Sequence, residues 1–447
     1  MKNLKKLLLV TVSALAITAN AAEVTSLNQP VTTASDLQVK LNFFAHFQTG
    51  IRNQSHLSGA EKNLSKNKKD FAFFNEAAMS ADVSHEFNGV NYGANVILVP
   101  TAKRKSGPFN GSHIYMESNF GKVEAGSPKS AASKMGLEAG EIASATGGDW
   151  DRYADFSLER FKGGSQIDPS FATFAEFFLD SKLVTKLDSR SYSSEPARAI
   201  AYYTPKFELG DKTKTQLGIS YSPDSANTGA DNHSENGRPA DKRTISLGGA
   251  DGKTPVDLFE INRNVKDAIT AGISVEQNLA DGVDLKVALT GEHAKAAGNA
   301  KRINVVNGVS TTTAIYKLND LRSYNLGAVL SFGNFSYAGS YGSLGKSLTT
   351  KAFHKTGQKT TYYTGAMAYK QGPFTASLSY FKSNQYGNVV DAVSIGTDCK
   401  LAPGIKPYAE ITAFTLKGRP EFYQGTTPGK KNTSRGTVAL IGAKLSL

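Results

Sequence analysis

The stretch Phe374-Thr375-Ala376-Ser377-Leu378-Ser379-Tyr380 decides the fold class, because apolar and polar side chains alternate at every position. Successive side chains of a β-strand point to opposite faces, so a period of two predicts a strand with one apolar and one polar face. The same alternation recurs through residues 39–48, 76–84, 216–222, 269–276, 285–292 and 439–447. The sequence therefore predicts an all-β, antiparallel architecture built from two-faced strands.

The connections between these strands alternate between short turns and long polar loops. Several turns contain Asn-Gly or Asp-Gly, which favour hairpins. Short turns are expected near 87–89, 119–121, 205–212, 280–282, 332–334, 371–373 and 402–404. Long loops are expected at 52–70, 101–111, 128–197, 223–266, 294–320, 342–359, 383–388 and 417–435. Seven turns and eight loops join sixteen strands, a layout typical of transmembrane barrels in the bacterial outer membrane.

Aromatic residues gather at both ends of the predicted strands and keep the parity of the apolar face. Beside the short turns lie Phe87, Phe120, Phe332, Phe335 and Phe374. Nearer the long loops lie Tyr221, Tyr324, Tyr341, Tyr363 and Tyr380. Two aromatic rows that bound an apolar band are what membrane interfaces select. A soluble sandwich or propeller explains the alternation equally well, but it does not explain these two rows.

The N-terminus has the pattern of an export signal. Lys2, Lys5 and Lys6 precede a short apolar run, and Ala19-Asn20-Ala21 is an A-x-A cleavage site. We therefore expect a signal peptide at 1–21 and a mature barrel at 22–447, whose formal net charge falls from +12 to +9 as the three lysines leave. The alternative is an amphipathic first helix of a cytosolic protein. Cys399 is the only cysteine, so no internal disulfide can form.

Two short segments resemble a known family. Residues 115–127, which run from Tyr115 to Ser127, are similar to the strand, tight Phe-Gly turn and short strand that lead into the third loop of the general porins of Gram-negative bacteria. Residues 199–205 resemble the strand that leaves that loop. The resemblance implies a sixteen-stranded transmembrane barrel, a homotrimer and a third loop folded into the lumen. One departure is the final Leu447, where the family commonly ends in an aromatic residue.

The long loop 128–197 is the candidate pore constriction, because fixed charges at a narrow point decide which ions pass. Its acidic candidates are Glu138, Glu141, Asp149, Asp151 and Asp155. Basic candidates on the barrel wall are Lys40, Arg198, Lys286 and Lys444. The alternative is that the acids form a solvated outer loop and that the wall lysines lie away from the narrowest point.

These features favour an outer-membrane pore for small hydrophilic solutes and ions. The alternatives are a substrate-selective channel and a surface adhesin or receptor on the same barrel, and the sign of any ion selectivity stays open. The basic clusters Lys66, Lys68, Lys69 and 103–105 favour lipopolysaccharide phosphates as partners. No enzyme, cofactor, metal or nucleic-acid motif is found, so an enzyme and a nucleic-acid partner are not expected.

Overall fold

Strands account for most of the described chain. The computed structural model describes residues 37–55, 70–99, 109–154, 197–225, 242–247, 256–262, 264–306, 309–350, 359–385, 387–417 and 433–447. The predicted signal peptide, the basic clusters in 56–69 and 101–105, and Asp155 lie outside these residues. Within them, no helix has the length and apolar character needed to cross a membrane.

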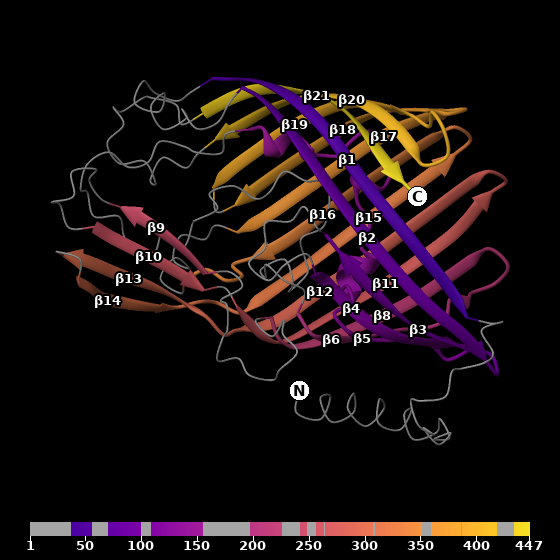
Figure 1. The fold of residues 1–447 in the computed structure, drawn as a ribbon, viewed down its shortest axis with the longest axis horizontal. Helices are drawn as coiled ribbons and strands as arrows, with labels where there is room; N and C mark the ends of the chain where they lie inside the picture. The colour runs from indigo at the N-terminus through magenta and orange to yellow at the C-terminus, as the bar shows by residue number, and fades with distance from the viewer. Residues whose placement is uncertain are drawn as a thin grey trace. The chain divides into compact units, whose positions relative to one another are not determined.

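One antiparallel sheet closes on itself into a barrel (Figure 1). Its strands are β1 (Gln38–Gln54), β2 (Phe71–Phe87), β3 (Val90–Leu98), β4 (Phe109–Ser118), β5 (Gly121–Gly126), β6 (Ala199–Tyr203), β7 (Phe207–Glu208), β8 (Thr213–Asp224), β11 (Val265–Ala280), β12 (Val283–Ala296), β15 (Leu321–Phe332), β16 (Phe335–Gly345), β17 (Thr360–Gln371), β18 (Phe374–Gln385), β19 (Asn388–Cys399), β20 (Ile405–Lys417) and β21 (Thr433–Ser446). The first and last strands pair from Phe44↔Ser446 to Gln54↔Gly436, which closes the barrel.

The predicted number of strands is confirmed. The sheet has 17 named strands, but β6 and β7 follow one another along the same partner, β8. They are therefore two parts of one strand of the barrel, interrupted at residues 204–206, and the barrel wall has sixteen strands when β6 and β7 are counted together.

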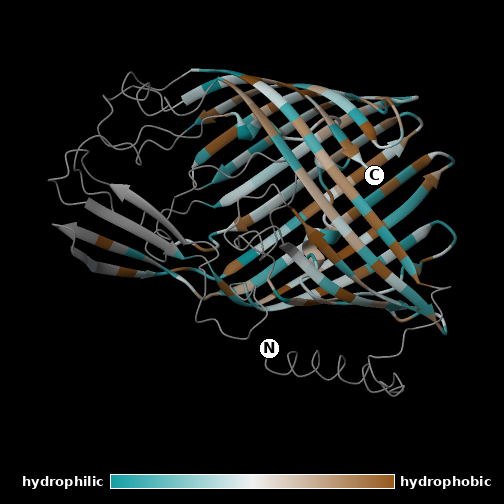
Figure 2. Cartoon of the chain, viewed as in Figure 1, coloured by the Kyte–Doolittle hydropathy of each residue, from teal (hydrophilic) through white to brown (hydrophobic). Residues whose placement is uncertain are grey.

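The two faces of the strands differ as the alternation predicts (Figure 2). On β18, Leu378 and Tyr380 are 45% and 40% exposed, whereas Ser377 and Ser379 between them are buried. We call the face with exposed apolar side chains the apolar face and the opposite one the polar face. Exposed large apolar side chains occur on almost every strand of the barrel, as expected for a surface that meets lipid rather than water.

Both aromatic rows are present on the apolar face. Near the short turns, the Phe335 ring lies between Phe332 and Tyr369, with centroids 5.8 Å and 4.8 Å away. Near the long loops, the Tyr341 ring lies between Tyr324 and Tyr363, at 5.9 Å and 5.0 Å. Each row thus continues through direct ring contacts across three neighbouring strands.

Two of the long outer connections contain a sheet that the sequence did not reveal. β9 (Lys242–Leu247) and β10 (Val256–Asn262) lie in one connection, and β13 (Asn299–Val306) and β14 (Val309–Lys317) lie in another. They form a separate four-stranded antiparallel sheet in the order β14-β13-β10-β9. The expectation of polar loops at 223–266 and 294–320 is therefore wrong in part, because these short runs find partners far away in the sequence.

The helical elements between β5 and β6 are short. They are α3 (Ala131–Met135), the 3₁₀ turn η2 (Ala139–Glu141) and the 3₁₀ turn η3 (Asp149–Arg152). All three belong to the predicted long loop, and together with their flanks they form the candidate site.

Candidate functional site

Residues 127–154 form what we call the third-loop segment. It begins directly after β5, where the Ser127 backbone N–H donates to the Ser112 carbonyl of β4 at 2.7 Å. The Arg198 guanidinium, just before β6, donates to the Ser127 hydroxyl at 2.7 Å. Arg198 therefore joins the start of the long loop to its end.

The first part of the segment is held by two hydroxyls on neighbouring strands. The backbone N–H groups of Ala131 and Ala132 donate to Ser220 Oγ of β8 and Thr270 Oγ1 of β11, at 3.1 and 3.2 Å. Met135 then packs over Gly218 and Gly272 of the same two strands. Both strands thus present their polar face to this part of the segment.

The middle of the segment needs a glycine on the wall. Asn325 of β15 donates to the Leu137 carbonyl at 3.4 Å. Two residues further along β15, a Cβ on Gly327 would overlap that same carbonyl oxygen. Glycine is the residue that lets a strand and another backbone approach this closely. Beyond it, Ala139 N–H donates to Thr364 Oγ1 of β17 at 3.2 Å.

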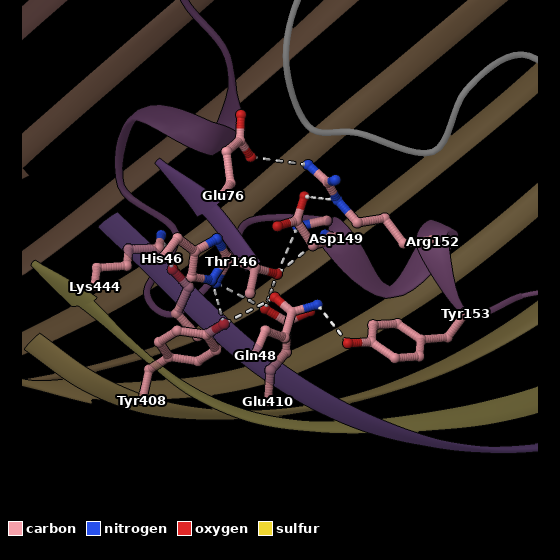
Figure 3. A network of polar contacts seen from close by, with 12 residues as sticks. His46, Gln48, Glu76, Thr146, Asp149, Arg152, Tyr153, Tyr408, Glu410 and Lys444 are labelled. Atoms are coloured by element: carbon pink, nitrogen blue, oxygen red, sulfur yellow. Dashed lines mark hydrogen bonds and ion pairs between the residues drawn. The ribbon is translucent and has the colours of Figure 1, made fainter. Parts of the chain in front are cut away.

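Three consecutive backbone N–H groups then meet three consecutive strands. Ser144 N–H donates to Ser377 Oγ of β18 at 2.8 Å. Ala145 N–H donates to Asp398 Oδ2 of β19 at 3.1 Å. Thr146 donates to Glu410 Oε2 of β20 twice, from its N–H at 3.0 Å and from its hydroxyl at 2.7 Å (Figure 3). Lys444 of β21 completes the series by donating to the Ala145 carbonyl at 2.6 Å.

The end of the segment reaches the first two strands. Arg152 pairs with Asp149 at 3.3 Å and with Glu76 of β2 at 3.6 Å (Figure 3). Gln48 of β1 donates to the Tyr153 hydroxyl at 3.2 Å, and Arg52 donates to the Tyr153 carbonyl at 3.2 Å. Burial raises the pKa of the Tyr153 phenol, so it stays protonated.

An apolar cluster supports this end of the segment. Trp150 is 1% exposed and its ring stacks on Phe414 with centroids 4.8 Å apart. Around them pack Tyr153, Phe381, Val390, Leu416, Val438 and Leu440. Toward the long loops, the polar face of β18–β21 therefore becomes apolar where it carries the segment.

Taken in order, the segment runs along the polar face from β8 through β21 to β1 and β2. Nearly every strand on the way contributes one side chain to a backbone group or side chain of the segment. A backbone group without a partner costs free energy when buried, and each hydrogen bond contributes on the order of 1 kcal/mol net. The wall thus fixes the position of a loop segment that has little regular structure of its own.

The predicted acidic residues have different surroundings. Glu138 is 3% exposed, whereas Glu141 is exposed. Asp149 is paired with Arg152, and Asp151 is half-buried in the same 3₁₀ turn. Their side chains are thus not equivalent, and Asp155 lies outside the described residues.

The predicted basic residues are also dispersed. Lys444 contacts the segment directly. Arg198 binds Ser127 at the start of the loop. Lys286 pairs with Glu276 on the next strand at 3.7 Å. Lys40 is exposed near the start of β1, before the first residue that pairs with β21.

The sequence interpretation missed the carboxylates of the wall. Glu410 and Asp398 accept hydrogen bonds from the segment, Glu76 pairs with Arg152, and Glu124 of β5 pairs with Lys134 at 2.6 Å. All four have polar-face parity in an alternating strand. A carboxylate on the polar face of a predicted strand was the sequence signal that could have identified them.

In the part of the chain that the structure describes, no three histidine, cysteine or carboxylate side chains gather to hold a metal ion.

These features define an outer-membrane β-barrel channel: a closed barrel of sixteen strands, an apolar outer face with two aromatic rows, and a loop segment along the polar face. A family model described as Gram-negative porin matches residues 8–419, and the chain belongs to this family.

Similar proteins occur in Rickettsia. An uncharacterised protein of Rickettsia bellii is 42% identical over 451 residues, which cover 99% of this chain and 100% of that protein. One of Rickettsia felis is 41% identical over 436 residues, covering 93% and 94% of the two chains. Among solved structures, a porin refined at 1.8 Å resolution matches with TM-score 0.47 and 13% identity, over 92% of this chain and 100% of that one. An anion-selective porin from Comamonas acidovorans matches with TM-score 0.48 and 16% identity, over the same shares.

Proposed function

We propose that this protein is a passive diffusion channel for small hydrophilic solutes and ions. The observation that carries the proposal is the path of the third-loop segment along the polar face. A segment held by side chains of β8, β11, β15, β17–β21, β1 and β2 lies inside the ring of strands that hold it. It therefore narrows the lumen without relying on its own secondary structure.

The composition of the polar face favours a general channel over one for a particular sugar. Apart from the apolar cluster around Trp150, the wall offers hydroxyls, amides and carboxylates where it meets the segment, such as Ser220, Thr270, Asn325, Ser377 and Glu410. A ladder of aromatic side chains along the lumen would instead indicate a selective sugar channel. The hydroxyl-rich wall supports passage of many small polar solutes.

A homotrimer is part of the proposal. β5 has only 6 residues, whereas β11 has 16 and β12 has 14. A tilted strand needs about 9–11 residues to cross the hydrocarbon core. The wall at β5 is therefore too low to face lipid alone, and neighbouring subunits can cover it. We also propose cleavage of the export signal after Ala21 and contact with lipopolysaccharide at the outer surface.

Single-channel recording tests the channel. Purified protein added to a planar bilayer should give discrete, ohmic conductance steps, and proteoliposomes should swell in small sugars but not in large ones. Unheated protein in SDS should migrate as an oligomer and heated protein as one chain. Protein that inserts in the heat-modifiable form but never conducts would contradict the channel, and a monomer mass in native detergent would contradict only the trimer.

A further inference from the structure

Lysines surround one carboxylate on the polar face, on the short-turn side of the third-loop segment. Glu276 of β11 lies in register with Lys214 of β8 and with Lys286 of β12. Lys206, in the break between β6 and β7, places its Nζ 3.0 Å from both Glu276 oxygens. Lys286 Nζ lies 3.7 Å from Glu276, and Lys214 Nζ lies 3.6 Å from Glu208. We call Lys206, Lys214 and Lys286 the lysine row.

A second basic group lies across the barrel seam. Lys406 of β20 is in register with Lys444 of β21, which is in register with His46 of β1. The nearby carboxylate is Asp398, 4.0 Å from Lys406 Nζ. Since Asp398 also accepts the Ala145 N–H, its charge is shared between the lysine and the loop backbone.

The two groups lie at different depths relative to the segment. Glu276 is four residues from Gly272, where Met135 packs, so the lysine row lies roughly 13 Å along its strand from the segment, at about 3.3 Å per residue. Lys406 instead neighbours Lys444 and Asp398, which both bind Ala145 of the segment. A solute that passes the segment therefore meets lysines on two well-separated parts of the wall.

The lysines of both groups are well exposed. The side chains of Lys206, Lys214, Lys286 and Lys406 are 49%, 55%, 52% and 49% exposed. Among their carboxylate partners, Glu276 is 34% exposed and is shared by Lys206 and Lys286, whereas Glu208 is 72% exposed and Asp398 is 8% exposed. The lysine row therefore carries three ammonium groups against two carboxylates, which leaves an excess of positive charge on this part of the wall.

The described acids of the segment do not reverse this balance. Asp149 is 16% exposed and paired with Arg152, which is itself 31% exposed. Glu138 is 3% exposed. Glu141 is the exposed acid of the segment, and Lys129 and Lys134 are exposed cations on it.

From this arrangement we infer that the channel, if it conducts as proposed above, passes small anions such as chloride and phosphate in preference to cations. The exposed lysines of the wall, and the lysine row above all, set this preference. The Debye length is about 8 Å at 0.15 M ionic strength, so these charges act on ions that pass close to the wall. Fixed charges that line a pore decide selectivity in this way.

The test is the ratio of chloride to potassium permeability, measured from the zero-current potential of single channels in a KCl gradient. The wild-type ratio is expected to exceed one. Lys206→Gln/Lys214→Gln/Lys286→Gln leaves Glu208 and Glu276 unpaired, and it should roughly halve the ratio, most clearly at low salt where screening is weak.

The apolar face offers a matched control. Lys295 pairs with Asp267 at 3.2 Å, and Lys382 and Lys417 share Asp391 at 3.6 and 3.9 Å. All three lysines share the parity of exposed apolar side chains near the long loops. Lys295→Gln/Lys382→Gln/Lys417→Gln removes the same charge and takes the lysine partners from the same number of carboxylates, so the permeability ratio should stay at the wild-type value.

Each outcome decides the inference. A wild-type ratio below one overturns it while the channel stands. Equal effects of the two triple variants also overturn it, because the charge would then act through the whole molecule. Should the lumen variant fail to assemble, Lys406→Gln must lower the ratio in the same direction, and an unchanged ratio overturns the role of the wall lysines. Inserted wild-type protein that carries no current contradicts the proposed channel itself.

Discussion

Leu378 and Ser377 are neighbours on β18, and they show how differently the two faces of the barrel constrain the sequence. Leu378 is 45% exposed among other apolar side chains, and any side chain compatible with lipid satisfies that position. Ser377 is buried, and its hydroxyl contacts both the backbone N–H and the hydroxyl of Ser144, at 2.8 and 2.7 Å. The apolar face thus requires a class of side chain, whereas the polar face under the segment requires particular ones.

The largest expected effect is a charge on the apolar face. Leu378→Arg should make insertion into the bilayer less favourable by about 2–4 kcal/mol if the residue lies near the bilayer midplane. The measurement is the fraction of protein that reaches the heat-modifiable form in liposomes. Ser377→Arg is the companion variant. It should insert like wild type but displace Ser144 and raise single-channel conductance, and equal insertion defects in both would break the comparison.

A side chain at Gly327 should have the next largest effect, because Leu137 leaves no room for a Cβ. Gly327→Leu should cost about 1–3 kcal/mol in local strain, and the segment should relieve it by leaving the wall. We expect larger and noisier single-channel currents. Gly365→Leu on β17 is the control, since nothing lies within 4 Å of its added Cβ. Identical currents in the two variants would show that the segment does not depend on close contact with β15.

Loss of an anchoring carboxylate should have a smaller effect. Glu410→Ala leaves the Thr146 N–H and hydroxyl without their acceptor, at a cost of about 1–3 kcal/mol. Open-channel current noise should rise as the segment moves. Glu410→Gln keeps a carbonyl acceptor and should restore a quiet current. If Gln is as noisy as Ala, the charge and not the hydrogen bond holds the segment.

The smallest expected effect is that of Asp149→Asn. The substitution removes one negative charge and leaves Arg152, which paired with Asp149 at 3.3 Å, with Glu76 as its remaining carboxylate partner. Half-exposed ion pairs contribute only about 0–1 kcal/mol, so assembly should be unaffected. The chloride-to-potassium permeability ratio should rise slightly. A larger change than that of the lysine-row variant would mean that the segment, not the wall, dominates selectivity.

The faces and the strands of the barrel were predictable from the sequence because they depend on local alternation. Leu378, Phe374 and Tyr380 reveal their face through their immediate neighbours. The separate sheet of β9, β10, β13 and β14 was not predictable, because Asp257 and Asn304 become partners only through pairing across distant loops.

The candidate site was harder to predict than the fold. Parity could place Glu410 and Lys444 on the polar face, but no local pattern tells which backbone group of the loop each one meets. Leu440 even breaks the alternation of β21, because its polar-parity position packs against the segment instead of facing water. Such contacts depend on the path of the loop, which depends in turn on strands far away in the chain.

The anchoring of the third-loop segment also depends on closure of the barrel. Six side chains that hold the segment follow it in the chain, and the last of them, Lys444, lies on the final strand β21: Ser220, Thr270, Thr364, Ser377, Glu410 and Lys444. Gln48 and Arg52, which hold Tyr153, lie on the strand that pairs with the last one. The full set of these contacts is therefore available to the segment only in a barrel whose final strand has paired with the first.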